Sequence, residues 1–238
     1  LEDANINAIT QDSKGRIWIA GESPTLAIQE KDGKFHNFIA KEGFPKGVAA
    51  TALWADRDGS VWVGTNGAGL FRYQDGKFHN YSIKEGITTL IINTIRRDQS
   101  DTLWVGGQNG LYREEEGHFT RYQNPDGAFA PKVGAILEDR EENLWVCNDT
   151  YLHRFNNTKL TPIDLSNATG TLATSGVCHT ADGSIWGSSN LGVTHLEDGK
   201  RTNYTTAQGL PENDIASIFA GFDNTVWVAT SNGSYAFW

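Results

Sequence analysis

The sequence contains no methionine and only two cysteines among its 238 residues. Cys147 and Cys178 are too few for a disulfide framework or a cysteine metal site, and whether they form a bridge stays open. The chain also lacks the charged and then apolar leader of a secreted protein. We therefore expect a segment excised or processed from a longer protein.

Positive charge is scarce as well, since 20 Lys and Arg stand against 29 Asp and Glu, a formal net charge of −9. Nucleic acids and anionic membranes bind clustered Lys and Arg, so we expect neither as a partner. No apolar run approaches the roughly 18–20 residues that span a bilayer, and no membrane contact is expected. No motif indicates a cofactor, and we expect none.

Short strands with tight turns are what the remaining composition indicates. The chain has 26 glycines and 8 tryptophans, and short runs of Thr, Ile and Val alternate with Gly, Asp and Asn clusters. No segment carries a sustained apolar stripe at helical spacing. The pattern predicts an all-β protein.

A phrase centred on tryptophan recurs six times: GRIWIA, GSVWVG, DTLWVG, ENLWVC, GSIWGS and NTVWVA. Its tryptophans are separated by 44, 42, 41, 41 and 41 residues; they are Trp18, Trp62, Trp104, Trp145, Trp186 and Trp227. Six copies at this spacing indicate a repeated structural unit.

Each unit predicts four antiparallel strands. The first lies about ten residues before the tryptophan, the second carries it, and a third follows a Gly/Asn turn. The fourth begins at an Asp-Gly type of turn, a strong hairpin signal because both residues tolerate positive φ. The stretch DGKFHN, at 32–37 and again at 75–80, is such a turn with the start of a strand. His36 and His79 therefore lie on separate outer strands, and we expect no shared site.

Four strands per unit of about 40 residues are typical of a β-propeller blade. We predict one propeller domain over residues 1–238, in which the last blade has three strands and the six blades close a ring. The blades lie at about 1–43, 44–86, 87–127, 128–168, 169–209 and 210–238. The alternative is part of a larger propeller, or one completed by self-association through open terminal blades.

Two columns of small residues flank the tryptophans. Ten residues before them stand Ala8, Ala52, Thr94, Ala135, Gly176 and Ser217. Two residues after them stand Ala20, Gly64, Gly106, Cys147, Ser188 and Ala229. Small side chains suit inner strands that are crowded near an axis, and we expect the six tryptophans to fill the space between blades as structural core.

The phrases GSVWVGTNGAGLFRYQDGKFHNY (60–81) and GLPENDIASIFAGFDNTVWVATSNG (209–233) resemble the two-component regulator propeller repeat. That repeat has a Gly-Leu-Pro, an Ile-x-x-Ile strand, Asp-x-x-Gly, Leu-Trp-Val-Gly-Thr and Asn-Gly-Leu, in this order. Such repeats typically form the periplasmic or extracellular sensor region of bacterial hybrid histidine kinases and some diguanylate cyclases. The resemblance implies a ligand-sensing or interaction module without catalysis of its own.

A small molecule or glycan would bind most readily at the mouth of the central channel. Polar residues eleven positions before a tryptophan, and residues nearby that break the repeat, are the candidates: Asn7, Thr51, Asn93 and Ser175, with Trp54, Arg96, Lys132 and Asp214. Function is most readily added to a repeated frame at non-repeated residues.

Two other functions stay open. Propeller lyases of the streptogramin-inactivating type have comparable repeats, and such an enzyme would need a His/Glu metal group, for which His179 and Glu138 are the candidates near inner strands. The propeller could instead serve only as a spacer or assembly surface.

Overall fold

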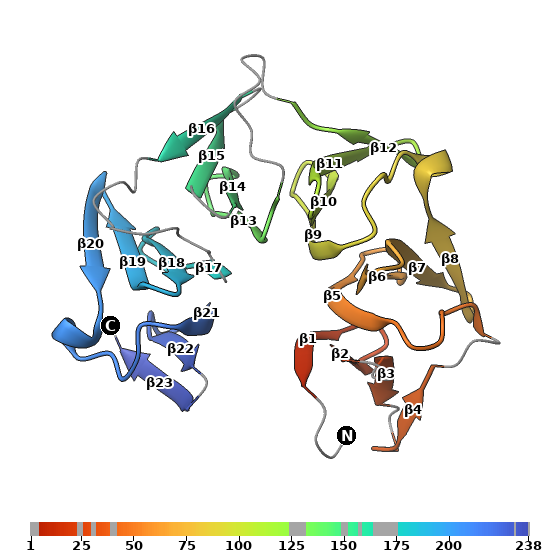
Figure 1. Ribbon diagram of the computed structural model, residues 1–238, viewed down its shortest axis with the longest axis horizontal. Coiled ribbons are helices and arrows are strands. Elements are labelled where there is room, and N and C mark those ends of the chain that lie inside the picture. The colour runs from red at the N-terminus through yellow and green to blue at the C-terminus, as the bar shows by residue number, and fades with distance from the viewer. Residues whose placement is uncertain are drawn as a thin grey trace. The chain divides into compact units, whose positions relative to one another are not determined.

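The computed structural model describes residues 5–22, 26–29, 32–38, 42–123, 132–148, 152–156, 159–163, 176–230 and 232–237. It divides into two compact units, Leu1–Gln123 and Asn124–Trp238, each built from three antiparallel sheets (Figure 1). Each sheet follows chain order, so that every strand pairs with the next along the sequence.

The first unit contains sheets 1 to 3. Sheet 1 comprises β1 (Ile6–Gln11), β2 (Ile17–Gly21), β3 (Leu26–Gln29) and β4 (Phe35–Asn37). Sheet 2 comprises β5 (Ala49–Ala55), β6 (Val61–Asn66), β7 (Leu70–Gln74) and β8 (Lys77–Tyr81), followed by the short 3₁₀ helix η2 (Ile83–Glu85). Sheet 3 comprises β9 (Ile92–Arg97), β10 (Leu103–Gly107), β11 (Gly110–Glu115) and β12 (His118–Arg121).

The second unit contains sheets 4 to 6. Sheet 4 comprises β13 (Ala135–Glu138), β14 (Leu144–Cys147), β15 (Leu152–Asn156) and β16 (Lys159–Ile163). Sheet 5 comprises β17 (Gly176–His179), β18 (Ile185–Ser189), β19 (Gly192–Glu197) and β20 (Lys200–Tyr204), followed by η3 (Thr206–Gln208). Sheet 6 has the predicted three strands, β21 (Ile215–Ala220), β22 (Val226–Thr230) and β23 (Gly233–Phe237). The single domain and the closed ring stay predictions.

The two columns of small residues are paired with each other across the first and second strands. Ala8 lies opposite Ala20, Ala52 opposite Gly64, and the remaining four pairs follow the same register. A Cβ atom at Gly64 would lie only 2.7 Å from the Ile92 side chain of sheet 3. The small residues therefore let the next sheet approach closely, as the sequence predicts.

Four buried tryptophans fill the space between their own sheet and the next sheet in the same unit: Trp18, Trp62, Trp145 and Trp186. Trp18 packs with Val61, Val63 and Phe71 of sheet 2, and it has no exposed surface. Trp186 packs in the same way with Ile215 and Ile218 of sheet 6. Trp62, Trp104 and Trp145 are at most 5% exposed, so the core prediction is confirmed for five of the six tryptophans.

The indole N–H of four tryptophans donates to an aspartate six residues earlier in the turn between the first two strands. The pairs are Trp18–Asp12 (2.8 Å), Trp62–Asp56 (3.0 Å), Trp104–Asp98 (2.7 Å) and Trp145–Asp139 (2.7 Å). The same carboxylates accept backbone N–H groups of the turn, such as that of Arg16. In sheet 5 Thr180 replaces the aspartate and accepts from Trp186 at 3.3 Å.

Sheet 6 departs from the pattern, and the core prediction is wrong for Trp227, whose side chain is 47% exposed. The position six residues earlier is Gly221, which has no side chain to accept the indole N–H. The hydrogen bond that holds the other five tryptophans to their turns is thus missing.

The carboxylate of Asp12 is charged in the folded protein at neutral pH. Burial by itself raises the pKa of Asp12, but hydrogen bonds from the Trp18 indole and from Arg16 outweigh it, and the net pKa is lowered. A folded-state pKa below the unfolded value stabilises the fold above about pH 4, and this contribution is lost as the pH falls through the folded pKa.

We predict that Asp12→Ala lowers the free energy of unfolding by about 1–3 kcal/mol, because the buried Trp18 N–H is left without an acceptor. Urea denaturation followed by tryptophan fluorescence measures this, and the difference from wild type should shrink between pH 5 and pH 3. The control is Asp223→Ala, in the sheet 6 turn that lacks the indole contact. An equal loss in both variants would show that the indole bond contributes nothing.

Candidate functional site

The predicted channel residues Asn7 and Thr51 are used to join neighbouring sheets. The Asn7 side chain donates to the carbonyl of Ala50 at 2.9 Å, and the Thr51 hydroxyl donates to the carbonyl of Ile92 at 2.5 Å. Each bond runs from one first strand to the next, from β1 to β5 and from β5 to β9. These two side chains hold adjacent sheets in register, and Asn93, on β9, is half-buried.

Trp54 and Arg96 are brought together by the structure, although 42 positions separate them in the sequence. They lie on the adjacent first strands β5 and β9, and the Arg96 guanidinium lies 5.1 Å from the centre of the Trp54 ring. Both occupy the position directly opposite the core tryptophan of their sheet. The buried indole N–H of Trp54 has no hydrogen-bond partner among the described residues.

Three further candidates are Lys132, Ser175 and Asp214. Lys132 and Asp214 belong to the second unit, where Lys132 is half-buried and Asp214 exposed. Ser175 lies outside the described residues. The convergence of all these residues at one channel mouth stays a prediction, and the pair Trp54–Arg96 is the part of the site that the structure assembles.

Next to this pair lies an ion pair that sequence reasoning missed. Arg97 donates from Nε and Nη2 to the Asp56 carboxylate at 2.8–3.0 Å, and its side chain is 13% exposed. Burial by itself raises the pKa of Asp56, but hydrogen bonds from Arg97, Arg57 and Trp62 lower it below the usual range. The signal was present in the sequence, since an arginine directly before the sheet 3 turn breaks the repeat.

The candidate metal pair of the lyase alternative lies on β13 and β17. Glu138 is 6% exposed, and the Nδ1 atom of half-buried His179 lies 3.4 Å from the carbonyl of Thr180. Within the described residues no group of three or more His, Cys, Asp and Glu side chains is arranged to hold a metal ion. His36 and His79 lie on the separate strands β4 and β8, and His36 contacts Glu42 at 3.0 Å.

Both cysteines are free thiols buried in the second unit. Cys147 occupies the small-residue column opposite Ala135, and Cys178 lies opposite Trp186. Burial raises the pKa of the Cys178 thiol to about 12. No disulfide joins them, and Cys178 is protonated at neutral pH.

Comparison with known proteins agrees with this organisation. The family model described as the two-component regulator propeller matches residues 1–23. The resemblance inferred from the sequence is confirmed for that segment, and a search of curated proteins finds none that matches the chain.

Several solved structures share the fold. The extracellular domain of a putative hybrid two component system from B. thetaiotaomicron aligns with 98% of the chain, with 18% identity and a TM-score of 0.74. Virginiamycin B lyase from Staphylococcus aureus aligns with 98% of the chain, with 17% identity and a TM-score of 0.77. The WD40 beta propeller domain of Doa1 aligns with 97% of the chain, with 11% identity and a TM-score of 0.71. The predicted β-propeller fold is confirmed.

The chain spans 38% of the length of the extracellular domain of the hybrid two component system, 84% of the lyase and 77% of the Doa1 domain. At these identities the likeness concerns the fold alone. Among the described residues, no helix has the length and apolar character to cross a bilayer.

We predict that neither thiol reacts with a disulfide reagent in the folded protein at pH 8. With a pKa of about 12, roughly one Cys178 side chain in ten thousand is a thiolate at this pH. A colorimetric thiol assay should count no fast-reacting thiol in buffer and two in urea, and Cys147→Ser should give one in urea. Rapid reaction of a single thiol in buffer would contradict the buried, inert state.

Proposed function

We propose that the chain is a ligand-sensing or interaction module from the periplasmic or extracellular part of a bacterial signal-transduction receptor, without catalysis of its own. One combined observation carries this proposal: a two-component regulator propeller repeat begins a chain that shares its fold over 98% of its length with the extracellular domain of a hybrid two component system. Output domains would then belong to other parts of the receptor.

The assembled pair Trp54–Arg96 supports a binding role. An aromatic ring and a guanidinium offer stacking and charge to a small molecule or glycan. Both residues stand on strands, which hold side chains more precisely than loops do. Thr51, three residues before Trp54, ties these two strands together.

We predict that the ligand, found in a panel of small metabolites and oligosaccharides, raises the melting temperature with increasing concentration. Binding to the folded state stabilises it by about 2.7 kcal/mol at a ligand concentration of one hundred times Kd. Differential scanning fluorimetry measures the shift, which Arg96→Gln and Trp54→Leu should reduce, while Arg113→Gln on the outer part of sheet 3 should retain it.

Two results would contradict the sensing role. Chemical conversion of the bound compound, followed by mass spectrometry, would favour the lyase alternative. Absence of a shift with every compound would favour a purely structural propeller.

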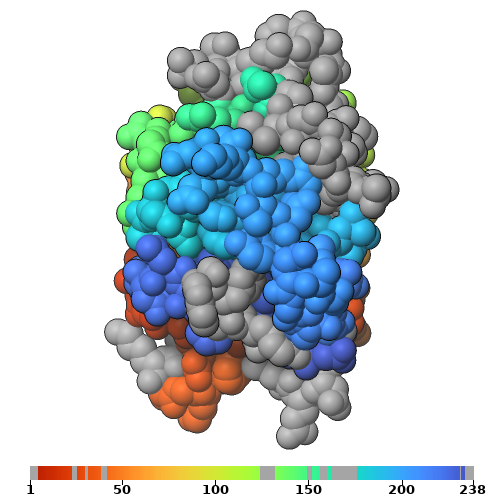
Figure 2. Space-filling model, turned by 90° about the vertical axis from the view of Figure 1, so that its left-hand side faces the viewer, coloured from red at the N-terminus to blue at the C-terminus, as the bar shows by residue number. Residues whose placement is uncertain are grey.

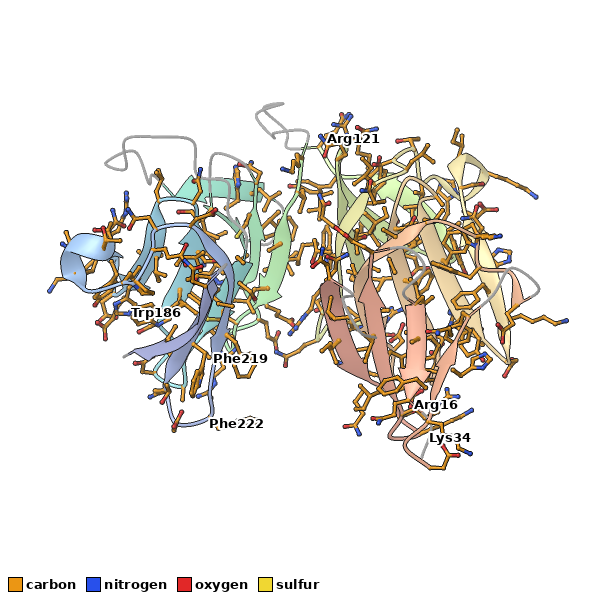
Figure 3. All side chains as sticks on the ribbon, turned by 60° about the horizontal axis from the view of Figure 1, so that its bottom comes forward. Arg16, Lys34, Arg121, Trp186, Phe219 and Phe222 are labelled. Carbon is orange, nitrogen blue, oxygen red and sulfur yellow. The ribbon has the colours of Figure 1, made fainter. Side chains whose placement is uncertain are left out.

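Self-association is a second candidate role, and exposed aromatic residues of sheet 6 favour it. Phe219 lies directly opposite Trp227, and these side chains are 62% and 47% exposed. Phe222, at the turn between the same strands, is fully exposed, and Figure 3 shows Phe219 and Phe222 projecting from this end of the sheet. Exposed apolar patches of this kind are typical of protein interaction sites.

We predict that the chain self-associates at high concentration through this aromatic face of sheet 6. Light scattering across a hundredfold concentration range should show a rising mass, and the double variant Phe219→Thr/Trp227→Gln should stay monomeric because the apolar area is lost. Ile83→Thr removes a more exposed apolar residue from η2 and serves as the control. A monomer at every wild-type concentration would contradict the role.

A further inference from the structure

A cavity of about 410 Å³ lies between sheets 4 and 5, within the second unit and apart from the Trp54–Arg96 pair. Figure 2 shows this side of the protein, with the green surface of sheet 4 adjoining the cyan and blue surface of sheet 5. Sheet 4 contributes charged and amide groups together with the core Trp145. Sheet 5 contributes Ile185, Leu196 and its β19–β20 turn. The volume is within the range of small-molecule sites.

The repeat explains why space is left here. Between sheets 1 and 2, the rings of Phe38, Tyr73 and Phe78 fill the corresponding region around Trp18, with centroid separations of 5.0–5.2 Å. The strand registers put Leu196 at the position that corresponds to Tyr73, because each pairs with the residue directly before the tryptophan of its own sheet. Leu196 lines the cavity, so an aromatic ring is replaced here by a smaller aliphatic side chain that leaves space beside Trp145.

One carboxylate of the cavity wall is already satisfied within the protein. Asp139 is 4% exposed and accepts from the Trp145 indole at 2.7 Å and from the Asn143 side chain at 2.9 and 3.0 Å. It belongs to the structural turn and has little capacity left for a ligand. The charges available to a ligand are those of Glu141, Asp198 and Arg154.

These three charges are not paired with one another. In sheet 2, Arg72 forms an ion pair with Asp58. The corresponding residues of sheet 4 are Arg154 and Glu141, but Arg154 donates instead to the Asn143 Oδ1 atom at 2.8 Å and lies over Trp145. Among the described residues neither Glu141 nor Asp198 has an ion-pair partner.

We propose that this cavity binds a small zwitterion of the amino acid or dipeptide class. The carboxylates of Glu141, from sheet 4, and Asp198, from sheet 5, would pair with the ligand's ammonium group. Arg154 would pair with its carboxylate, the planar geometry that a guanidinium recognises best. Ile185 and Leu196 offer apolar contacts to a side chain.

The charge balance of the cavity favours this class over others. With Asp139 included, three carboxylates face one guanidinium, so that a phosphate or another multiply charged anion would meet net repulsion. A neutral ligand would form no ion pair with Glu141 or Arg154. The inference gives the proposed sensing role a second site with a defined ligand chemistry, and it rests on that role only for its biological meaning.

The test uses isothermal titration calorimetry of the full chain with L-leucine and the dipeptide Leu-Leu. N-acetyl-L-leucine, which lacks the ammonium group, and L-leucine amide, which lacks the carboxylate, are the matched probes. We expect saturable binding of at least one zwitterion, and at least tenfold weaker binding of both blocked compounds, as the loss of one charge-assisted contact requires.

Variants then locate the site. Glu141→Gln and Asp198→Asn should weaken binding of the zwitterion about tenfold or more. Arg154→Gln should weaken binding of L-leucine and leave the affinity for L-leucine amide unchanged. Leu196→Tyr introduces the ring present at Tyr73 and should abolish binding by filling the cavity. Glu116→Gln, an exposed glutamate of the first unit, should bind like the wild type.

The inference is overturned if neither zwitterion binds, if N-acetyl-L-leucine binds as well as L-leucine, or if Glu141→Gln and Asp198→Asn bind like the wild type. Should Leu196→Tyr fail to fold, the charge variants decide alone. The sensing role is tested separately from this inference. If no zwitterion binds but another compound stabilises the protein through Trp54 and Arg96, the sensing role survives and this inference fails. If a zwitterion binds in the cavity and is chemically converted, this inference survives and the sensing role fails.

Discussion

The hydrogen bond from a tryptophan indole to an aspartate six residues earlier organises four of the six sheets. It connects the side chain that fills the space between sheets to the turn that begins its strand. The same carboxylate accepts backbone N–H groups, so one residue fixes the turn and the orientation of the tryptophan together. A buried indole without this acceptor would carry an unsatisfied donor. Packing between sheets therefore depends on a charged group in a local turn.

Sheet 2 adds an ion pair to this hydrogen-bond arrangement, whereas sheet 6 lacks the arrangement. Asp56 accepts from Trp62 and also forms an ion pair with Arg97 of the next sheet, so that the turn contributes directly to contact between sheets. In sheet 6, Gly221 removes the acceptor and Trp227 is largely uncovered. An exposed tryptophan at a sheet face is compatible with a surface that another protein covers, whereas a buried and hydrogen-bonded tryptophan is compatible with a closed core.

Much of the fold could be predicted from the sequence because it depends on spacing and residue size. The tryptophan period gives the sheets, the Asp-Gly turns give the fourth strands, and the small columns face each other as crowding requires. The site was less predictable. Asn7 and Thr51 are polar residues of the first strands β1 and β5. Their hydrogen bonds join neighbouring sheets, which the residue types alone do not reveal. The contact of Trp54 with Arg96 depends on the register between two sheets.

Function in a repeated frame is carried by the residues that break the repeat, and the register shows why. Each position around a core tryptophan has a structural occupant, such as the aromatic rings beside Trp18. Where Leu196 takes such a position in sheet 5, the strands still pair in the register of the other sheets. The lost packing leaves a cavity, and unpaired charged groups gather along its wall. A change of a few side chains thus converts a structural contact between two sheets into a polar site, without a change in the turns or strands that hold it.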